Sequence, residues 1–223
     1  MLERKGVEVR RIDLVAAVHR LVVRAAGFPG ITVPAVRLEG VRLQGTGRIA
    51  RALDALVPEP RLVPADAAAR AEVERAEGWA DEVYQAAARR LAWATIKRDR
   101  SSVGSFLEGA RLGIPTGLAA RTAAPVIFLS ARLNRANDAA VRRDLAALPG
   151  WLDRIDGWLA EGVLGGREPN VADYQVATST RLLMAMDDVR PSIEDRPAGR
   201  HALRLVPTFP GRVPPVLPQS WLR

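Results

Sequence analysis

The sequence predicts a small α/β unit followed by an all-helical bundle. Three observations lead to this fold class. Residues 32–43 alternate between apolar and polar side chains as two short strands would, prolines interrupt the chain soon afterwards, and residues 170–186 have the composition of a helix inside a bundle. The predicted organisation is an α/β unit at 1–57, a linker at 58–65, an all-helical domain at 66–206 and a proline-rich tail at 207–223.

The helix predicted at 170–186 is the centre of the bundle. Asn170 and Asp173 are three residues apart at its start, so each side chain can accept a hydrogen bond from the backbone N–H of the other residue, as in a capping box. No charged residue occurs from Tyr174 to Thr180. A helix with no charged face must be covered by other helices, so we interpret this one as core.

The composition excludes several classes of site. The 223 residues include no cysteine, which excludes disulfides, thiolate metal ligands and a cysteine nucleophile within this chain. The only histidines, His19 and His201, have no acidic or histidine neighbours at ligand spacing, so we expect no metal. We find no signal peptide and no membrane-spanning run, and we expect a cytoplasmic, bacterial-type protein without a membrane partner.

The net charge of +8 does not by itself indicate a nucleic-acid partner. Of 33 basic residues only Lys5 and Lys97 are lysines, and the arginines are dispersed among acidic residues. Few aromatic side chains are available to stack on bases. We therefore expect no nucleic acid to bind.

The first predicted elements are short. Residues 1–5 resemble the end of a helix, and a turn follows at Gly6. After the turn we expect a strand over Val7 to Ile12 and a helix over Leu14 to Ala26 that ends at Gly27. Because a helix of five residues cannot stand alone, we expect further residues upstream of Met1.

A hairpin and a helix follow. Pro34 lies where the first strand begins, and Glu39-Gly40 is typical of a hairpin turn. Residues 44–56 predict a helix with Ile49 and Leu53 on its apolar face, and we expect Thr46 to be its N-cap residue.

These residues carry a family resemblance. The Val33-Pro34 pair, the hairpin, a hydroxyl residue at the next helix start and the later capping box occur in the order found in glutathione transferases. The chain is therefore similar to that family over nearly its whole length. The resemblance implies an α/β thioredoxin-like N-terminal domain, here lacking its first strand and catalytic loop, followed by the family's all-α helical-bundle domain.

The resemblance also implies a glutathione site. The peptide bond before Pro34 is expected to be cis, with the backbone of Val33 pairing with the cysteinyl backbone of glutathione. A carboxylate of glutathione would lie at the helix start, where free amides and the hydroxyl of Thr46 favour an anion. Gly45 stands where the family has Glu or Asp. The expected glutathione-binding residues are thus Val33, Pro34, Gly45 and Thr46.

Two functions remain open. The family's thiol-activating Tyr, Ser or Cys follows the missing first strand, so no catalytic residue is assigned. One function is conjugation of glutathione, as co-substrate, to a small hydrophobic electrophile, and the other is a non-catalytic binding or protein-interaction module. The resemblance further implies a homodimer, with no metal.

Prolines at 58, 60 and 64 exclude a helix in the linker, and Asp66 is expected to cap a long helix reaching Arg98. Trp79 and Tyr84 on that helix either form the wall of a cleft or belong to the core. We interpret 99–115 as a loop, because its serines have no neighbouring base.

The rest of the helical domain predicts helices at 119–133 and 138–162, a kink or new start near Pro149 and a short helix from Pro197 to Leu205. The tail is expected to wrap the surface or stay loose. The expected buried side chains of the two middle helices are Val126, Phe128, Leu129, Leu145, Leu148, Leu152, Ile155 and Leu159.

Overall fold

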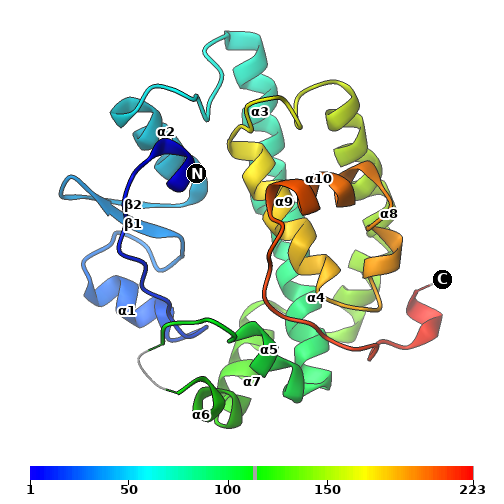
Figure 1. Cartoon of the computed structure of the whole chain (residues 1–223). Coiled ribbons are helices and arrows are strands. Elements are labelled where there is room, and N and C mark those ends of the chain that lie inside the picture. Colours follow the sequence, from blue (N-terminus) through cyan, green and yellow to red (C-terminus); the bar gives the residue numbers. More distant parts are fainter. Residues whose placement is uncertain (113–114, 223) are drawn as a thin grey trace.

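The computed structural model of the protein describes residues 1–112 and 115–222. Figure 1 shows two parts side by side: a smaller N-terminal unit with two strands and a larger bundle of helices. The predicted α/β unit followed by an all-α bundle is confirmed. The elements of the N-terminal unit are η1 (Glu3–Lys5), α1 (His19–Ala25), β1 (Ala35–Leu38), β2 (Val41–Gln44) and α2 (Thr46–Leu56).

The two strands form the predicted hairpin. They pair antiparallel, with Ala35 opposite Gln44 and Leu38 opposite Val41. The turn residues Glu39 and Gly40 have φ values of 46° and 84°. Both lie in the left-handed region that a two-residue hairpin turn needs, which explains the Glu-Gly pair in the sequence.

The strand predicted at Val7 to Ile12 is wrong. Among the described residues the only strand pairing joins β1 to β2, so no neighbouring strand satisfies the backbone of 7–12. The helix predicted at Leu14 to Ala26 begins only at His19. Ala17 has a φ of 63°, which a right-handed helix cannot contain, and this residue separates 14–16 from α1.

The start of α2 also differs from the prediction. Gly45, not Thr46, is the N-cap residue, and Thr46 is the first residue of the helix. Gly45 has a φ of 83°, a left-handed conformation that favours glycine. Ile49, Ala50 and Leu53 are buried on the face predicted from the sequence.

The long helix predicted from Asp66 to Arg98 consists of three consecutive segments. They are α3 (Ala67–Trp79), the π-helical turn η2 (Ala80–Tyr84) and α4 (Gln85–Arg98). The side chain of Asp66 accepts a hydrogen bond of 2.8 Å from the N–H of Ala69, so the predicted cap is present. A π-turn adds one residue to a helix, which rotates the residues after it relative to those before it.

Helix α9 (Val171–Met184) is the core helix predicted from its lack of charge. Figure 1 shows it inside the bundle, where it packs on α3, α4 and α10. Its capping box is formed by Asn170 and Asp173. The buried carboxylate of Asp173 also accepts from the N–H of Gly165 at 2.7 Å and lies 3.0 Å from Nε2 of His201.

The remaining helices surround α9. The predicted helix at 119–133 is divided into α6 and α7, and α8 continues through Pro149 without a new start. Phe128 and Leu129 were expected in the core but are 49% and 48% exposed, whereas Ile127 is 1% exposed. The bounds are η3 (Arg100–Ser102), α5 (Val103–Phe106), α6 (Thr116–Arg121), α7 (Ala124–Leu133), α8 (Asp138–Ala160), η4 (Arg190–Ser192), α10 (Pro197–Leu205) and η5 (Gln219–Trp221).

The proline-rich tail wraps the bundle, one of the two predicted outcomes. Val213 forms an isolated parallel bridge with Met186. One carboxylate oxygen of Asp188 accepts from the N–H of Val216 at 2.7 Å and of Leu217 at 2.9 Å. These contacts fix an extended segment that has few backbone donors of its own.

Tyr84 belongs to the core. It is fully buried and its ring stacks on Trp79 with 5.3 Å between the ring centroids. The hydroxyl of Thr180 already donates to the carbonyl of Val176, so the Tyr84 hydroxyl donates to Thr180 Oγ1 over 3.0 Å. Burial raises the pKa of this phenol. The core interpretation is therefore confirmed for Tyr84, while Trp79 is partly buried and packs against the core, and neither residue is among the described residues that line the cleft.

In the part of the chain that the structure describes, no helix is long and apolar enough to cross a membrane. Within the same residues no three potential metal-ligating side chains of the His, Cys, Asp or Glu type come together.

Candidate functional site

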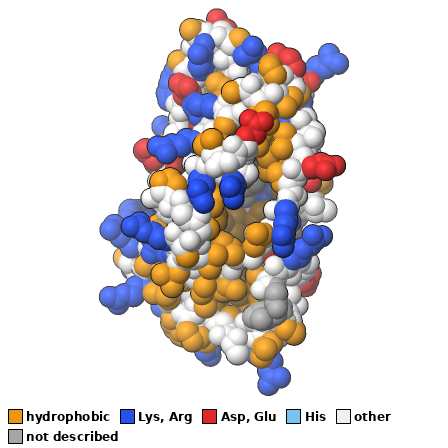
Figure 2. Space-filling model, turned by 90° about the vertical axis from the view of Figure 1, so that its left-hand side faces the viewer, with side chains coloured by type: hydrophobic (Ala, Val, Ile, Leu, Met, Phe, Trp, Pro, Cys, Tyr) orange, Lys and Arg blue, Asp and Glu red, His pale blue; other side chains and the backbone are white. Residues whose placement is uncertain are grey.

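A cleft separates the N-terminal unit from the helical bundle. It has a smaller lobe of about 410 Å³ and a larger lobe of about 600 Å³. Figure 2 shows a hollow with hydrophobic side chains along its floor and lower margin and Lys or Arg side chains on its rim. The residues that line both lobes are Leu14, Ala16, Arg89, Trp93, Phe106, Leu107 and Leu112.

The smaller lobe is apolar. Helix α4 contributes Trp93 and Ile96, α7 contributes Ile127, and the segment before α1 contributes Leu14. Arg89 is the one charged residue among the described residues that line it. This lobe can therefore hold an apolar group, with a single cation at its boundary with the larger lobe.

The edge predicted at Val33-Pro34 lies at the larger lobe. The peptide bond between these residues is cis, as the resemblance implies. Val33 is 50% exposed and lines the lobe together with Thr32. Within the described residues no hydrogen bond engages the backbone N–H or C=O of Val33. Both groups are therefore available to a peptide-like ligand.

The start of α2 lies beside this edge. The N–H of Gly45 donates to the carbonyl oxygen of Pro34 over 3.1 Å, which joins the two predicted halves of the site. The amides of Thr46, Gly47 and Arg48 have no acceptor among the described residues, because a glycine N-cap offers no side chain. Free amides at a helix start favour an anion.

The four predicted residues thus form one contiguous segment of surface, but only Val33 lines the cleft itself. Pro34 immediately precedes β1 and is hydrogen-bonded to Gly45. Gly45 and Thr46 form the start of α2. A Cβ at Gly47 would meet the side-chain ends of Glu77 and Arg51, which would have to move aside where α2 approaches α3.

Gln44 is a positioning residue that was not predicted. Its Oε1 accepts from the N–H of Gly30 at 2.5 Å and its Nε2 donates to the carbonyl of Thr32 at 2.9 Å. The side chain thereby ties the loop before Pro34 to the end of β2. The sequence carries no signal for this role, because both partners of the Gln44 amide are backbone groups of another segment.

The charged groups of the larger lobe were also not predicted. Asp13 is the one carboxylate among its described lining residues, and it accepts from Arg11 Nε at 2.7 Å and from the N–H of Arg111 at 2.9 Å. The hydrogen bond from the Arg111 backbone, followed by that from Arg11, holds the pKa of Asp13 below its usual range. The other charged or titratable residues of this lobe are His19, Arg20 and Arg89.

Hydroxyl groups in the cleft are few. Among the described lining residues they belong to Thr32, Thr122 and Ser130. The hydroxyl of Thr122 donates to the carbonyl of Leu118 at 2.9 Å, and Ser130 is 3% exposed. The described lining residues include no tyrosine or cysteine that could activate a thiol.

Comparison with solved structures reveals the fold. The chain is similar to the crystal structure of a glutathione S-transferase from Rhodospirillum rubrum F11, with a TM-score of 0.53 and 18% sequence identity. The match covers 99% of this chain and 90% of that one. This protein has a glutathione transferase-like fold. No protein-family model matches the sequence, and neither does any curated protein.

The glutathione transferase-like fold explains why the cleft is where it is. The N-terminal unit presents the hairpin and the start of α2, while α4, α7 and residues 103–112 of the bundle provide most of the opposite wall. Figure 1 shows that these walls come from segments far apart in the sequence. The likeness covers both parts, so it supports the order of elements predicted from the motifs.

Proposed function

We propose that this protein binds glutathione along the Val33-Pro34 edge, with one carboxylate at the start of α2 and the thiol directed toward the cleft. The backbone of Val33 pairs with the peptide backbone of glutathione, and the amides after Gly45 and the Thr46 hydroxyl hold the carboxylate. The hydrogen bond from Gly45 N–H to the Pro34 carbonyl, 3.1 Å long, is the observation that carries the proposal.

An apolar electrophile in the smaller lobe is the second part of the proposal. That lobe adjoins the larger one through shared residues, so a thiolate in the larger lobe and an apolar group in the smaller one are neighbours. Conjugation of the two is the chemistry that this arrangement supports, because the cleft holds both reactants near each other.

The carboxylate contact has a direct test. Calorimetric titration of Thr46→Val with glutathione is expected to show an affinity about tenfold weaker than that of the unmodified protein, because a hydrogen bond to a charged group is lost. Cysteinylglycine lacks the γ-glutamyl carboxylate, so its affinity should not respond to the substitution. Thr178→Val, on α9 and outside the described cleft lining, is the matched control.

Two results would refute this site. Either the unmodified protein fails to bind glutathione, or Thr46→Val weakens glutathione and cysteinylglycine equally. Equal weakening would mean that the hydroxyl does not contact the γ-glutamyl group.

A non-catalytic binding module is the second candidate function. The observation that favours it is that the described lining residues include no phenol or thiol, and that two of their three hydroxyls are either hydrogen-bonded, at Thr122, or buried, at Ser130. A conjugation assay with glutathione and an aryl halide separates the two candidates. Product formation supports the transferase, and glutathione binding without product supports the module.

A homodimer is part of the same proposal, in keeping with the family that the fold resembles. Sedimentation equilibrium measures it directly, with twice the chain mass of 24.2 kDa expected.

A further inference from the structure

The outward side of α6 and α7 is apolar. Helix α7 buries Ile127, whereas its neighbours Phe128 and Leu129 are each about half exposed. Leu118 of α6 is 54% exposed. None of the three exposed residues lines either lobe of the cleft. Large apolar side chains that gather at a surface, away from the ligand cleft, indicate an interaction site.

Positive charge accompanies these apolar residues, without negative charge. Residues 109–137 contain four arginines and no Asp or Glu. Two of the four, Arg121 of α6 and Arg132 of α7, are exposed. The first acidic residue after this segment, Asp138, already forms an ion pair with Arg98. The positive charge of the segment is therefore not neutralised from within it.

Each of the two helices places an arginine beside an apolar residue. Arg132 follows Phe128 by four residues, and Arg121 follows Leu118 by three, so each pair shares one side of its helix. We name this surface the α6–α7 face; it is formed by Leu118, Arg121, Phe128, Leu129 and Arg132.

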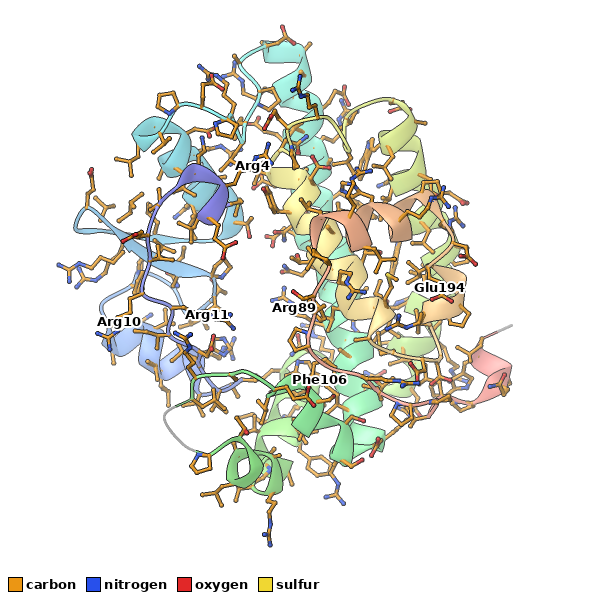
Figure 3. All side chains as sticks on the ribbon, in the orientation of Figure 1. Arg4, Arg10, Arg11, Arg89, Phe106 and Glu194 are labelled. Carbon is orange, nitrogen blue, oxygen red and sulfur yellow. The ribbon has the colours of Figure 1, made fainter. Side chains whose placement is uncertain are left out.

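The α6–α7 face is separate from the cleft. Figure 1 shows α6 and α7 together at the bottom of the molecule. In Figure 3, Arg89 lies at the space between the two parts of the protein, whereas side chains of α6 and α7 point away from it at the lower end. Figure 2 shows hydrophobic side chains gathered over the lower part of the molecule, with most Asp and Glu side chains above them.

Helix α1 has the same character as α6 and α7. Leu21 is 75% exposed, and residues 14–38 contain three arginines and no Asp or Glu. Both α1 and α7 contribute residues to the larger lobe of the cleft, so they border it from opposite parts of the protein. The area without acidic residues thus continues from the bundle to the N-terminal unit.

We propose that the α6–α7 face binds the surface of an anionic lipid bilayer. Its apolar side chains enter the boundary between headgroups and acyl chains, and its arginines contact the lipid phosphates. Binding of this kind needs no membrane-spanning helix, and none is present among the described residues. The inference departs from the expectation of no membrane partner, which rested on the lack of a signal peptide and of a spanning run.

A protein partner fits this face less well than a bilayer. In a two-fold dimer the same face of both copies meets, so Arg121 and Arg132 would approach the arginines of the other copy with no carboxylate between them. An acidic protein of another kind would need a surface of matching shape. A fluid bilayer supplies negative charge over the whole face and adapts to its shape.

Flotation of the full chain with lipid vesicles, without glutathione, tests the proposal. One set of vesicles contains equal amounts of phosphatidylglycerol and phosphatidylcholine, and the other contains phosphatidylcholine alone. We expect binding to the anionic vesicles and little to the neutral ones. Binding should weaken as sodium chloride is raised from about 0.05 to about 0.5 M, because salt screens the arginines.

A double substitution separates this face from the general positive charge of the protein. The net charge of +8 by itself attracts anionic vesicles, and Phe128→Ser/Leu129→Ser leaves that charge unchanged. We expect about tenfold weaker binding to the anionic vesicles, because the apolar area that enters the bilayer is lost. Leu203→Ser on α10 removes another exposed apolar side chain and should not alter binding.

A matched pair of arginine substitutions tests the contribution of charge. Arg132→Gln should weaken binding about fivefold, as expected for the loss of one cation close to the lipid surface. Arg167→Gln removes the same charge from an exposed residue before α9 and should have a much smaller effect.

A fluorescent label reports which side of the protein contacts the lipid. The chain has no cysteine, so Leu129→Cys offers a single thiol for a polarity-sensitive fluorophore. Its emission should become brighter and shift to shorter wavelength when anionic vesicles are added. The same label at Leu203→Cys should not respond.

Several results would overturn the inference. One is a failure of the unmodified protein to bind the anionic vesicles. Another is unchanged binding of Phe128→Ser/Leu129→Ser, because net charge alone would then explain the attraction. A third is self-association in sedimentation velocity that this double variant abolishes, since a second copy would then cover the face. Glutathione binding is measured separately, so its failure would remove the proposed function and leave the lipid-binding face standing.

Discussion

The pKa of His19 in the larger lobe depends on its burial and on the arginines near it. Burial lowers its pKa, and the positive charges of Arg20 and Arg89 lower it further. We therefore expect the imidazole to titrate below 6.5 and Arg89→Met to move its pKa back toward that value. Proton NMR of the imidazole signals over pH 4 to 8 measures both.

The sign of the effect on stability follows from the same shift. In the unfolded chain His19 takes up its proton near pH 6.5, whereas in the folded protein it does so only at lower pH. The unfolded state therefore binds more protons as the pH falls below 6.5, so this residue makes acidification lower the free energy of unfolding. Arg132→Met is the control, and an unchanged His19 pKa in Arg89→Met would contradict the prediction.

Single residues also show where the sequence pattern is insufficient. Phe128 and Leu129 were expected inside because they are large and apolar, yet about half of each side chain is exposed, and Ile127 is buried instead. Helical periodicity gives the angles between side chains around the helix axis, but it does not show which face of the helix packs against the bundle. By contrast, Asn170 and Asp173 specify a local contact, so their capping box was predicted correctly.

At the level of elements, α10 depends on a close approach to the chain before it. A Cβ at Gly199 would collide with the carbonyl oxygen of Ile193 and with the backbone of Glu194. Because these obstacles are backbone atoms, Gly199→Ala must displace the first turn of α10. We expect a loss of about 3 kcal/mol or more in unfolding free energy, measured by urea denaturation.

Gly150 is the matched control for this substitution. It is exposed in the interior of α8, and a Cβ there would meet nothing within 4 Å. Gly150→Ala should stabilise the protein by about 0.5 to 1 kcal/mol, because alanine loses less backbone entropy in a helix. Equal changes in unfolding free energy for the two substitutions would show that the close approach of Gly199 to Ile193 does not exclude a side chain at that position.

Elements were predictable from sequence where the signal is local. The hairpin, α2, the core helix α9 and α10 each have turn or capping residues of their own, and all were found near their predicted places. The strand at 7–12 was wrong because a strand also needs a neighbour, which alternation in one segment does not reveal. The split of 67–98 by a π-turn had no such local signal.

For the whole molecule, the two parts share one hydrophobic core. Ile49 and Leu53 of α2 belong to the same buried cluster as Leu62 of the linker and Val176 of α9. The N–H of Val171 donates to the carbonyl of Leu62 over 2.8 Å, which fixes the linker to α9. We therefore expect a single cooperative unfolding transition, with calorimetric and van't Hoff enthalpies equal.

Scanning calorimetry tests this prediction. Two resolved transitions, one for each part, would contradict it. Arg51→Met is the control, because Arg51 joins α2 to Glu74 and Glu77 of α3 through ion pairs at the surface, 3.0 and 3.3 Å long. Such pairs contribute at most about 1 kcal/mol, so the substitution should shift the midpoint slightly without dividing the transition.

The candidate site could be predicted only in part, for a reason that belongs to the whole molecule. Val33, Pro34, Gly45 and Thr46 lie within one short stretch of sequence, so a family pattern could locate them. The charged groups of the cleft come from three segments, represented by Asp13, by His19 with Arg20, and by Arg89. Their proximity depends on how the two parts dock, which no local pattern specifies.

The position of Trp93 in the wall of both lobes has a practical consequence. Indole emission responds to the polarity and quenching of its surroundings, so occupancy of either chamber should change the native spectrum of the protein. Trp93→Phe would identify that component by its absence, since the chain has five tryptophans in all. Unlabelled compound libraries could therefore be screened for occupants of the cleft without any reporter dye.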